Sequence, residues 1–152
     1  MKRAYMRCMF VVVLVANGPL VLAQGGKDAK PPSLFERIGG SEVIGKVFDE
    51  VGGRMAADPL LAKFFQGQSQ EALMAQRQRA IEFLCHEMGG PCVYSGRPLK
   101  IAHGGLGITE DQWKAFLGHL TATLDHQKIG EKEKREVLAL VKRFKSDVVE
   151  KK

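Results

Sequence analysis

The sequence predicts a single domain built from α-helices, over residues 33–152. Apolar residues recur every three or four positions along several segments, which is the spacing of one helical face. Glycine and proline pairs separate these segments, and no stretch has the sustained alternation of a strand, since Val93–Tyr94 is too short to count. At 152 residues, with 45% apolar and 26% charged residues, the chain has the size and composition of one soluble globular domain.

The first 23 residues predict a secretory signal peptide rather than part of this domain. A basic start over residues 1–7 precedes a short apolar run over 8–16, and Ala23 is one of the small residues that a cleavage site requires. The alternative is an uncleaved membrane anchor, but the run is short for a span and Pro19 interrupts it. We therefore expect export, to the periplasm, with no membrane association after cleavage.

The formal net charge of +6 overstates the basicity of the mature protein. Cleavage would remove Lys2, Arg3 and Arg7, so the mature chain would have a formal net charge of about +3. Nucleic-acid binding needs a concentrated basic face, and these charges are few and dispersed. No nucleic-acid partner is therefore expected.

The start of the domain is marked by helix signals. Residues 24–32 are polar, with lysines and two prolines, and predict a flexible leader. Ser33 and Glu36 then have the spacing of a capping box, which begins a short helix. Gly39–Gly40 is expected to stop that helix, and Ser41 to cap the next one.

The second helix has one apolar face, formed by Ile44, Val47, Phe48, Val51 and Met55. Gly52 and Gly53 fall inside it, at a cost of about 1 kcal/mol each relative to alanine. They therefore either end the helix early or leave room beside whatever packs on it. Asp58–Pro59 opens the next turn. A compact apolar corner follows, made of Leu60, Leu61, Phe64 and Phe65.

A long helix is predicted over residues 70–88, and Gly89–Gly90–Pro91 ends it. Its apolar stripe is formed by Leu73, Ala80, Leu84 and Met88. Gln76 lies on the same face as this stripe. After a loop, a short helix over 99–103 breaks at Gly104–Gly105.

Two more helices complete the domain. Thr109 and Gln112 form a second capping box, followed by an apolar stripe at helical spacing. The stripe consists of Trp113, Phe116, Leu117, Leu120 and Leu124. Gly130 is expected to end this helix, and the last helix is predicted over 131–149.

One histidine, His103, stands at the end of the short helix, between Ala102 and a glycine pair. Neutral imidazole binds iron and other transition metals well. A glycine beside such a ligand lets the backbone approach a flat partner or turn sharply. On its own the pattern is weak, because a histidine in an apolar stretch is more often a core or surface residue than a ligand.

Several motifs in a fixed order strengthen the interpretation. They are residues 34–40, Asp58–Pro59–Leu60 with Phe64–Phe65, 89–91, 94–97, 102–108 and Gly118–His119–Leu120. In their order and spacing the chain resembles a group I truncated haemoglobin, over residues 33–150. The resemblance implies an all-α truncated globin fold, a two-over-two helical sandwich around a haem pocket. It also implies haem b (iron protoporphyrin IX) as cofactor and reversible binding of O₂, NO or CO, as in oxygen transport.

The resemblance makes His103 the proximal haem ligand and the one predicted metal ligand. The other expected cofactor-binding residues are Phe65, Gln76, Arg79, Ala80, Tyr94, Leu99, Leu106, Ile108, Trp113 and Phe116. Among them, Gln76 and Ala80 would occupy the distal face. Either Arg79 or Lys100 could pair with a haem propionate, because a cation suits a carboxylate, and the alternative for each is a solvated surface residue.

The chain departs from the family pattern on the distal side. The family usually carries a tyrosine on the second helix, where Gly52 stands here, and often a glutamine where this chain has Ala80. A distal hydrogen-bond donor favours bound O₂, so without these groups O₂ should leave faster and the iron should oxidise more easily. Gln76 is the remaining neutral donor on that face, and Arg79 is the other candidate. The alternative is an apolar, roomy pocket suited to NO or CO.

The remaining histidines and cysteines are assigned no role in the haem site. His119 is expected to be structural or half-exposed, His126 exposed, and His86 off the iron-facing direction. Cys85 and Cys92 are the cysteines of the mature chain, and they flank a glycine turn. Export would favour a disulfide between them, and two separate buried thiols are the alternative. The Cys85–His86 pair lacks the C-x-x-C-H form of covalent c-type haem attachment.

These features favour a gas-binding protein over an enzyme. No nucleophile–base pair or phosphate loop appears, so any chemistry must be that of the haem. The first alternative is haem-based redox activity, as an NO dioxygenase or a peroxidase-like enzyme, which would require a redox partner. The others are a haem transfer or interaction module, and a helical domain that has lost its haem.

Overall fold

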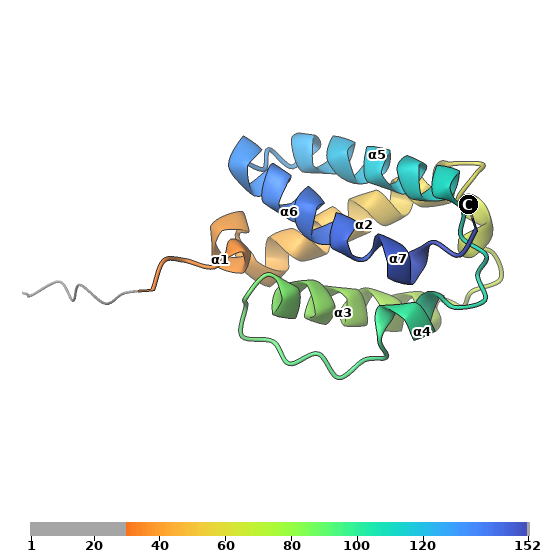
Figure 1. Ribbon diagram of the computed structural model, residues 1–152, viewed down its shortest axis with the longest axis horizontal. Helices are drawn as coiled ribbons and strands as arrows, with labels where there is room; N and C mark the ends of the chain where they lie inside the picture. The colour runs from red at the N-terminus through yellow and green to blue at the C-terminus, as the bar shows by residue number, and fades with distance from the viewer. Residues whose placement is uncertain (1–29, 152) are drawn as a thin grey trace, which may run out of the picture. The chain divides into compact units, whose positions relative to one another are not determined.

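The structure is a computed structural model, in which residues 30–151 are described (Figure 1). The predicted signal peptide and most of the predicted leader lie outside the described residues. Between residues 30 and 151, no helix has the length and apolar character needed to cross a membrane.

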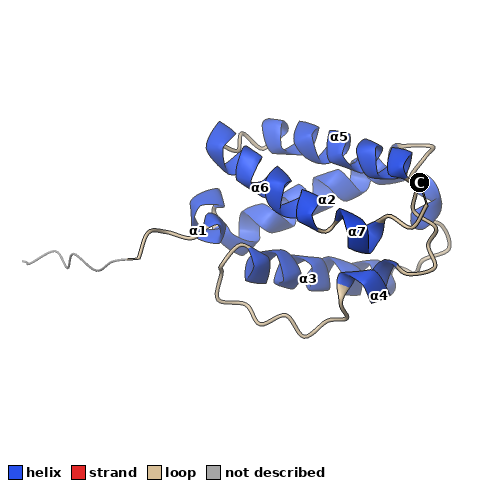
Figure 2. Ribbon diagram, in the orientation of Figure 1, coloured by secondary structure: helices blue, strands red, loops and turns tan. Residues whose placement is uncertain are grey.

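The described chain is helical. The helices are α1 (Leu34–Ile38), α2 (Gly40–Ala57), the 3₁₀ turn η1 (Ala62–Phe64), α3 (Gln70–Glu87), α4 (Leu99–His103), α5 (Glu110–His126), α6 (Glu131–Arg143) and α7 (Lys145–Val148). Figure 2 shows no strand in this part of the chain, where the only β-type pairing is an isolated bridge between Thr109 and Lys151. The all-α prediction is therefore confirmed.

Two helix pairs form the body of the domain (Figure 1). Helix α2 packs on α3, α5 packs on α6, and α2 also crosses α5. The shared core consists of Ile44, Val51, Ile81, Met88, Leu120, Leu124, Val137 and Leu140. A smaller cluster of Ile108, Trp113 and Val148 joins α7 to the start of α5. Helix α4 packs on α7, so the C-terminal end of the chain lies against the His103 helix.

Both predicted capping boxes are present. The Ser33 hydroxyl accepts from the Glu36 amide at 3.2 Å, and the Glu36 carboxylate accepts from the Ser33 amide at 2.7 Å. Thr109 and Gln112 make the same pair of bonds at the start of α5. These local signals needed no tertiary contact, and they fix where α1 and α5 begin.

Three predicted helix boundaries were wrong. Gly39, with φ 102°, ends α1 and leads directly into α2, so Ser41 lies inside the first turn and does not cap it. Helix α5 ends at His126 rather than at Gly130, because Lys128 adopts the left-handed conformation with φ 56°. The last helix breaks at Phe144, and the separate turn α7 buries Val148 in the smaller cluster.

The two internal glycines of α2 leave room rather than ending the helix. Helix α2 continues to Ala57, and a Cβ added at Gly52 would meet no atom within 4 Å. Space is therefore left beside the middle of α2.

The structure joins Cys85 and Cys92 in a disulfide, with Cα atoms 5.7 Å apart. It links the last turn of α3 to the loop that leads to α4. Gly90 lies between them, and a Cβ there would come within 2.7 Å of the Cys85 sulfur. The tight turn therefore requires glycine at this position.

Candidate functional site

The main cavity lies between the two helix pairs and has a volume of about 930 Å³. This is at the upper end of the range of about 300–1,000 Å³ typical of small-molecule sites. All eleven residues predicted for the cofactor site line it: Phe65, Gln76, Arg79, Ala80, Tyr94, Leu99, His103, Leu106, Ile108, Trp113 and Phe116. These residues come from separate helices and loops, so folding brings them to one place.

His103 lies in this wall as the last residue of α4 and is half-buried. Its Nδ1 is 2.9 Å from the carbonyl oxygen of Leu99, one turn earlier. A carbonyl oxygen can only accept, so Nδ1 carries the proton and Nε2 of the neutral ring keeps its lone pair. A backbone carbonyl on one ring nitrogen is the usual arrangement of a metal-binding histidine.

The rest of the wall is largely apolar and aromatic. The Trp113 and Phe116 rings pack against each other, with centroids 5.4 Å apart. Val51 and Gly52 of α2 and Ala80 of α3 also line the cavity. Because Gly52 has free space around it and Ala80 is small, this part of the cavity is roomy and apolar.

The polar groups in this region form a short chain of hydrogen bonds. The Gln76 amide donates to the Gln68 side-chain oxygen at 2.8 Å, and the Gln68 amide donates to the Phe64 carbonyl at 2.7 Å. Sequence reasoning missed Gln68, because it lies in a polar loop before α3 that gave no signal. Gln76 was found because it interrupts an apolar helical stripe.

Two cations line the cavity, Arg79 and Arg97, whereas Lys100 does not. Arg97 was not predicted, although it belongs to the 94–97 motif. Its loop is held by Tyr94, whose hydroxyl donates to the Arg97 carbonyl at 2.8 Å. The Tyr94 ring in turn packs edge-on against Phe83.

The other three histidines are outside the cavity wall, as predicted. His119 is half-buried and pairs with Asp58 at 2.7 Å. This hydrogen bond lowers the pKa of Asp58 below its usual range, and a hydrogen bond from the Leu60 amide lowers it further. His126 is exposed and contacts Glu50, and the His86 Nδ1 lies 3.3 Å from the Cys92 carbonyl oxygen.

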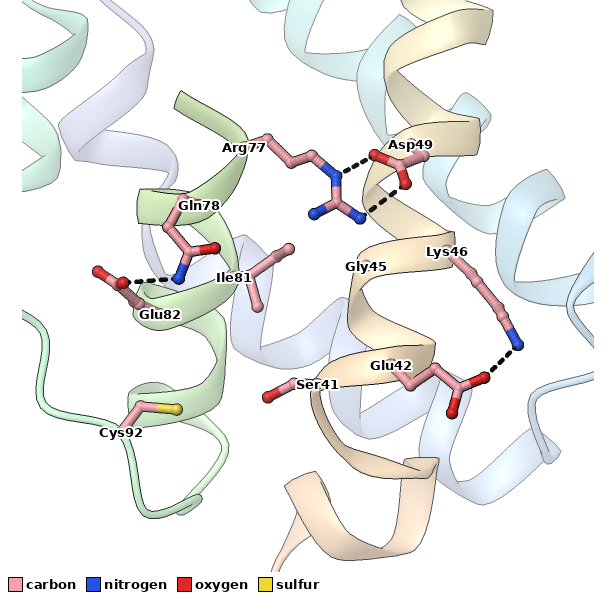
Figure 3. A pocket seen from close by; sticks show the side chains of 10 residues that line it. All are labelled: Ser41, Glu42, Gly45, Lys46, Asp49, Arg77, Gln78, Ile81, Glu82 and Cys92. Atoms are coloured by element: carbon pink, nitrogen blue, oxygen red, sulfur yellow. Dashed lines mark hydrogen bonds and ion pairs between the residues drawn. The ribbon is translucent and has the colours of Figure 1, made fainter. Parts of the chain in front are cut away.

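A second, smaller pocket of about 520 Å³ lies between α2 and α3 (Figure 3). Most charged side chains in its wall are paired with each other: Arg77 donates twice to Asp49, and Lys46 donates to Glu42. Glu82 accepts from the neutral Gln78 amide. The pair with Arg77 lowers the pKa of Asp49. In residues 30–151 there is no group of three potential metal-binding side chains, here or elsewhere. The main cavity is therefore the candidate site.

Comparisons with known proteins agree with this geometry. The profile of the bacterial-like globin family matches residues 33–150. The group 1 truncated haemoglobin GlbN of Mycolicibacterium paratuberculosis is 32% identical over 115 residues, covering 76% of this chain and 82% of that protein. GlbN of Nostoc sp. (strain MUN 8820) is 30% identical over 119 residues, covering 78% and 98%. The crystal structure of the Tetrahymena pyriformis truncated haemoglobin in its Fe(III) form superposes with a TM-score of 0.70, at 21% identity over 78% of this chain and 98% of that chain.

Two crossed helix pairs around an apolar cavity with one histidine define a globin of the truncated, two-over-two class. The chain belongs to the bacterial-like globin family, as a group 1 truncated haemoglobin. Membership of this family implies haem binding.

Proposed function

We propose that the protein binds haem b in the main cavity, with His103 as the proximal ligand, and reversibly binds O₂ or another diatomic gas. The observation that carries this proposal is the bond from His103 Nδ1 to the Leu99 carbonyl, which leaves the Nε2 lone pair free in a histidine that lines an apolar cavity. The bound haem would supply an iron atom that a diatomic gas can ligate.

The remaining residues fit the haem by their chemistry. The aromatic side chains Phe65, Trp113 and Phe116 offer flat apolar surface to a porphyrin and exclude water from it. Arg79 and Arg97 suit the two propionates, because a guanidinium pairs with a carboxylate through two parallel hydrogen bonds. Lys100 is less suited than these arginines, since it is absent from the cavity wall.

On the distal side, Gln76 is the residue that would donate to a bound gas. Its side-chain nitrogen has two hydrogens, and the bond to Gln68 uses one of them. The second hydrogen remains for a ligand. No tyrosine or glutamine stands at Gly52 or Ala80 to add another donor, which favours weak retention of O₂.

The protein is also proposed to be exported, with cleavage after Ala23. The basic and apolar segments of residues 1–23 support this proposal. So does the Cys85–Cys92 disulfide, because such bonds persist in oxidising compartments. Expression of the full chain in a Gram-negative host should give a periplasmic protein whose N-terminal sequencing begins at Gln24. A protein that keeps residues 1–23 would contradict this part of the proposal.

The test of haem binding is the absorption spectrum of the purified mature protein with added haemin, ferric and then reduced with dithionite, with and without CO. We expect a stoichiometric Soret band that shifts with CO. His103→Ala should abolish this band or make the haem readily lost, while His86→Ala, at an exposed histidine outside the cavity, should leave it unchanged.

Two results would change the proposal. No stoichiometric haem binding would contradict it. A six-coordinate ferrous spectrum that resists CO would mean that a second side chain ligates the iron, which would favour electron transfer over gas binding.

A further inference from the structure

Glu150, close to the C-terminal end of the chain, makes an unusual contact with the loop after His103. One of its carboxylate oxygens accepts from the Gly105 amide and the other from the Gly107 amide, both at 2.6 Å. Both oxygens of one side chain are thus engaged by a loop more than forty residues earlier. Hydrogen bonds to an ionised carboxylate are about twice as strong as neutral ones.

The loop conformation that allows this contact needs glycine. Gly105 has φ 83° and Gly107 has φ 63°, both in the left-handed region that other L-residues rarely adopt. When right-handed and left-handed residues alternate along the backbone, successive N–H groups turn toward a common point and create a small anion-binding site. The glycines after His103 therefore serve to wrap the chain around a carboxylate.

The backbone of the C-terminal segment holds the same loop. The amides of Glu150 and Lys151 both donate to the Ile108 carbonyl, at 2.9 and 3.1 Å, and the Glu110 amide donates to the Lys151 carbonyl at 3.2 Å. Two residues before Glu150, Val148 is buried against Ile108 and Trp113. The segment is thus anchored at several points, and Glu150 is held where it can act.

The loop leads directly to the cavity. The Leu106 amide donates to the His103 carbonyl at 3.3 Å, and Leu106 and Ile108 both line the cavity beside His103. A carboxylate that fixes Gly105 and Gly107 therefore fixes two wall residues and the end of the helix that carries the histidine.

We propose that Glu150 is a positioning residue for His103, whose carboxylate clamps the glycine loop and thereby sets the proximal side of the haem site. This inference rests on the proposed haem function. Groups hydrogen-bonded directly to a metal-binding histidine typically change metal affinity by about 10–100-fold when they are mutated, and Glu150 acts one step further away, through the loop. Glu150 is exposed and water competes for its bonds, so we expect about tenfold, at the lower end of that range.

The experiment compares Glu150→Ala and Glu150→Gln with Lys145→Gln. Lys145→Gln is the matched control, because it breaks the ion pair that Lys145 makes with Glu110 from the same segment without touching the glycine loop. Three measurements are made: amide hydrogen exchange at Gly105 and Gly107 in the haem-free protein, haem loss to apomyoglobin, and the iron–histidine stretching band in the resonance Raman spectrum of the reduced protein.

In Glu150→Ala we expect faster exchange at both glycines, about tenfold faster haem loss, and a shifted or broadened iron–histidine band. Glu150→Gln keeps one acceptor oxygen and should fall between Glu150→Ala and the wild type, which also guards against an alanine variant that folds poorly. Lys145→Gln should match the wild type in all three measurements.

Faster exchange with an unchanged iron–histidine band would overturn the proposal, since the loop would be held without positioning His103. Unchanged exchange would overturn it too, because the clamp would not exist in solution. If the wild type binds no haem, the proposed function fails and this inference fails with it, while the exchange data still report whether the clamp exists.

Discussion

The side chains of Gln76 and Gln68 are joined by a hydrogen bond of 2.8 Å, and both line the main cavity. Gln68 is in turn fixed to the backbone carbonyl of Phe64. Gln76 lies on α3, whereas Gln68 lies in the loop before it, so the bond ties the loop to the helix. The orientation of the proposed distal donor is therefore set by a residue outside the helix that carries it.

Replacing Gln76 tests its role as that donor. Gln76→Leu removes the amide but keeps similar bulk, so O₂ should dissociate about tenfold faster, as expected for the loss of one hydrogen bond of about 1.4 kcal/mol. Stopped-flow displacement of O₂ by CO measures this rate. The matched control is Gln78→Leu, the same change at an α3 residue that lines the smaller pocket and bonds to Glu82. Equal rates in both variants would exclude Gln76 as the donor.

Restoring a hydroxyl at Gly52 should have the opposite effect. A Cβ at this position would meet no atom within 4 Å, and Gly52 lines the main cavity, so we expect Gly52→Tyr to direct its phenol into the cavity. The phenol supplies the missing donor, and the protein should oxidise from ferrous to ferric in air about tenfold more slowly. Gly52→Phe fills the same space without the hydroxyl and is the control. If Phe slows oxidation as much as Tyr, the effect is exclusion of water and not hydrogen bonding.

Much of the fold could be predicted because its signals are local. The capping boxes at Ser33 and Thr109 depend on residues three positions apart, and the short helix Leu99–His103 is bounded by Pro98 and Gly104. Apolar periodicity predicted which helix faces are buried. The cavity wall could then be assembled from the order of the motifs, which resembles that of a known family.

The wrong or missing predictions concern tertiary contacts or backbone conformation. Ser41 is a good capping residue, but the left-handed Gly39 leaves no extended position for it before α2. After the break at Phe144, α7 buries Val148 against residues far earlier in the chain, and no local motif marks this contact. Glu150 has no local motif at all, because its two partners are more than forty residues away.

The disulfide is expected to stabilise the fold by closing the turn between α3 and the following loop. Closing a loop of this size lowers the conformational entropy of the unfolded chain and so stabilises the folded state by about 2–3 kcal/mol. The free energy of unfolding of the wild type, measured by denaturant titration, should therefore fall by about this amount when a reductant is added. The variant with both Cys85→Ala and Cys92→Ala should have the lower free energy of unfolding from the outset, and reductant should not change it. If reductant leaves the stability of the wild type unchanged, and the folded protein reacts with a thiol reagent, the disulfide does not form.

Glu50 makes the stability of the domain depend on acidity. Hydrogen bonds from Gln127, then His126 and Arg54, lower the pKa of Glu50 from its ordinary 4.5 to about 2. Arg54 lies on α2 itself, one turn after Glu50, whereas His126 and Gln127 tie α2 to the end of α5. A carboxyl whose pKa is lower in the folded than in the unfolded protein stabilises the fold above its unfolded pKa, and this contribution is lost as the pH falls through its folded pKa.

The stabilisation due to Glu50 should therefore disappear between pH 4.5 and about pH 2. Glu50→Gln cannot ionise, so it should be less stable than the wild type at neutral pH and should lose less stability over that acid range. The measurement is the free energy of unfolding as a function of pH, from denaturant titrations followed by far-UV circular dichroism. Because Glu50 is half-buried and its partner His126 is exposed, water and ions reach these contacts, and added salt should reduce the difference between the two proteins. Parallel pH profiles for the two proteins would show that the contacts of Glu50 with α5 and the residue after it do not persist in solution.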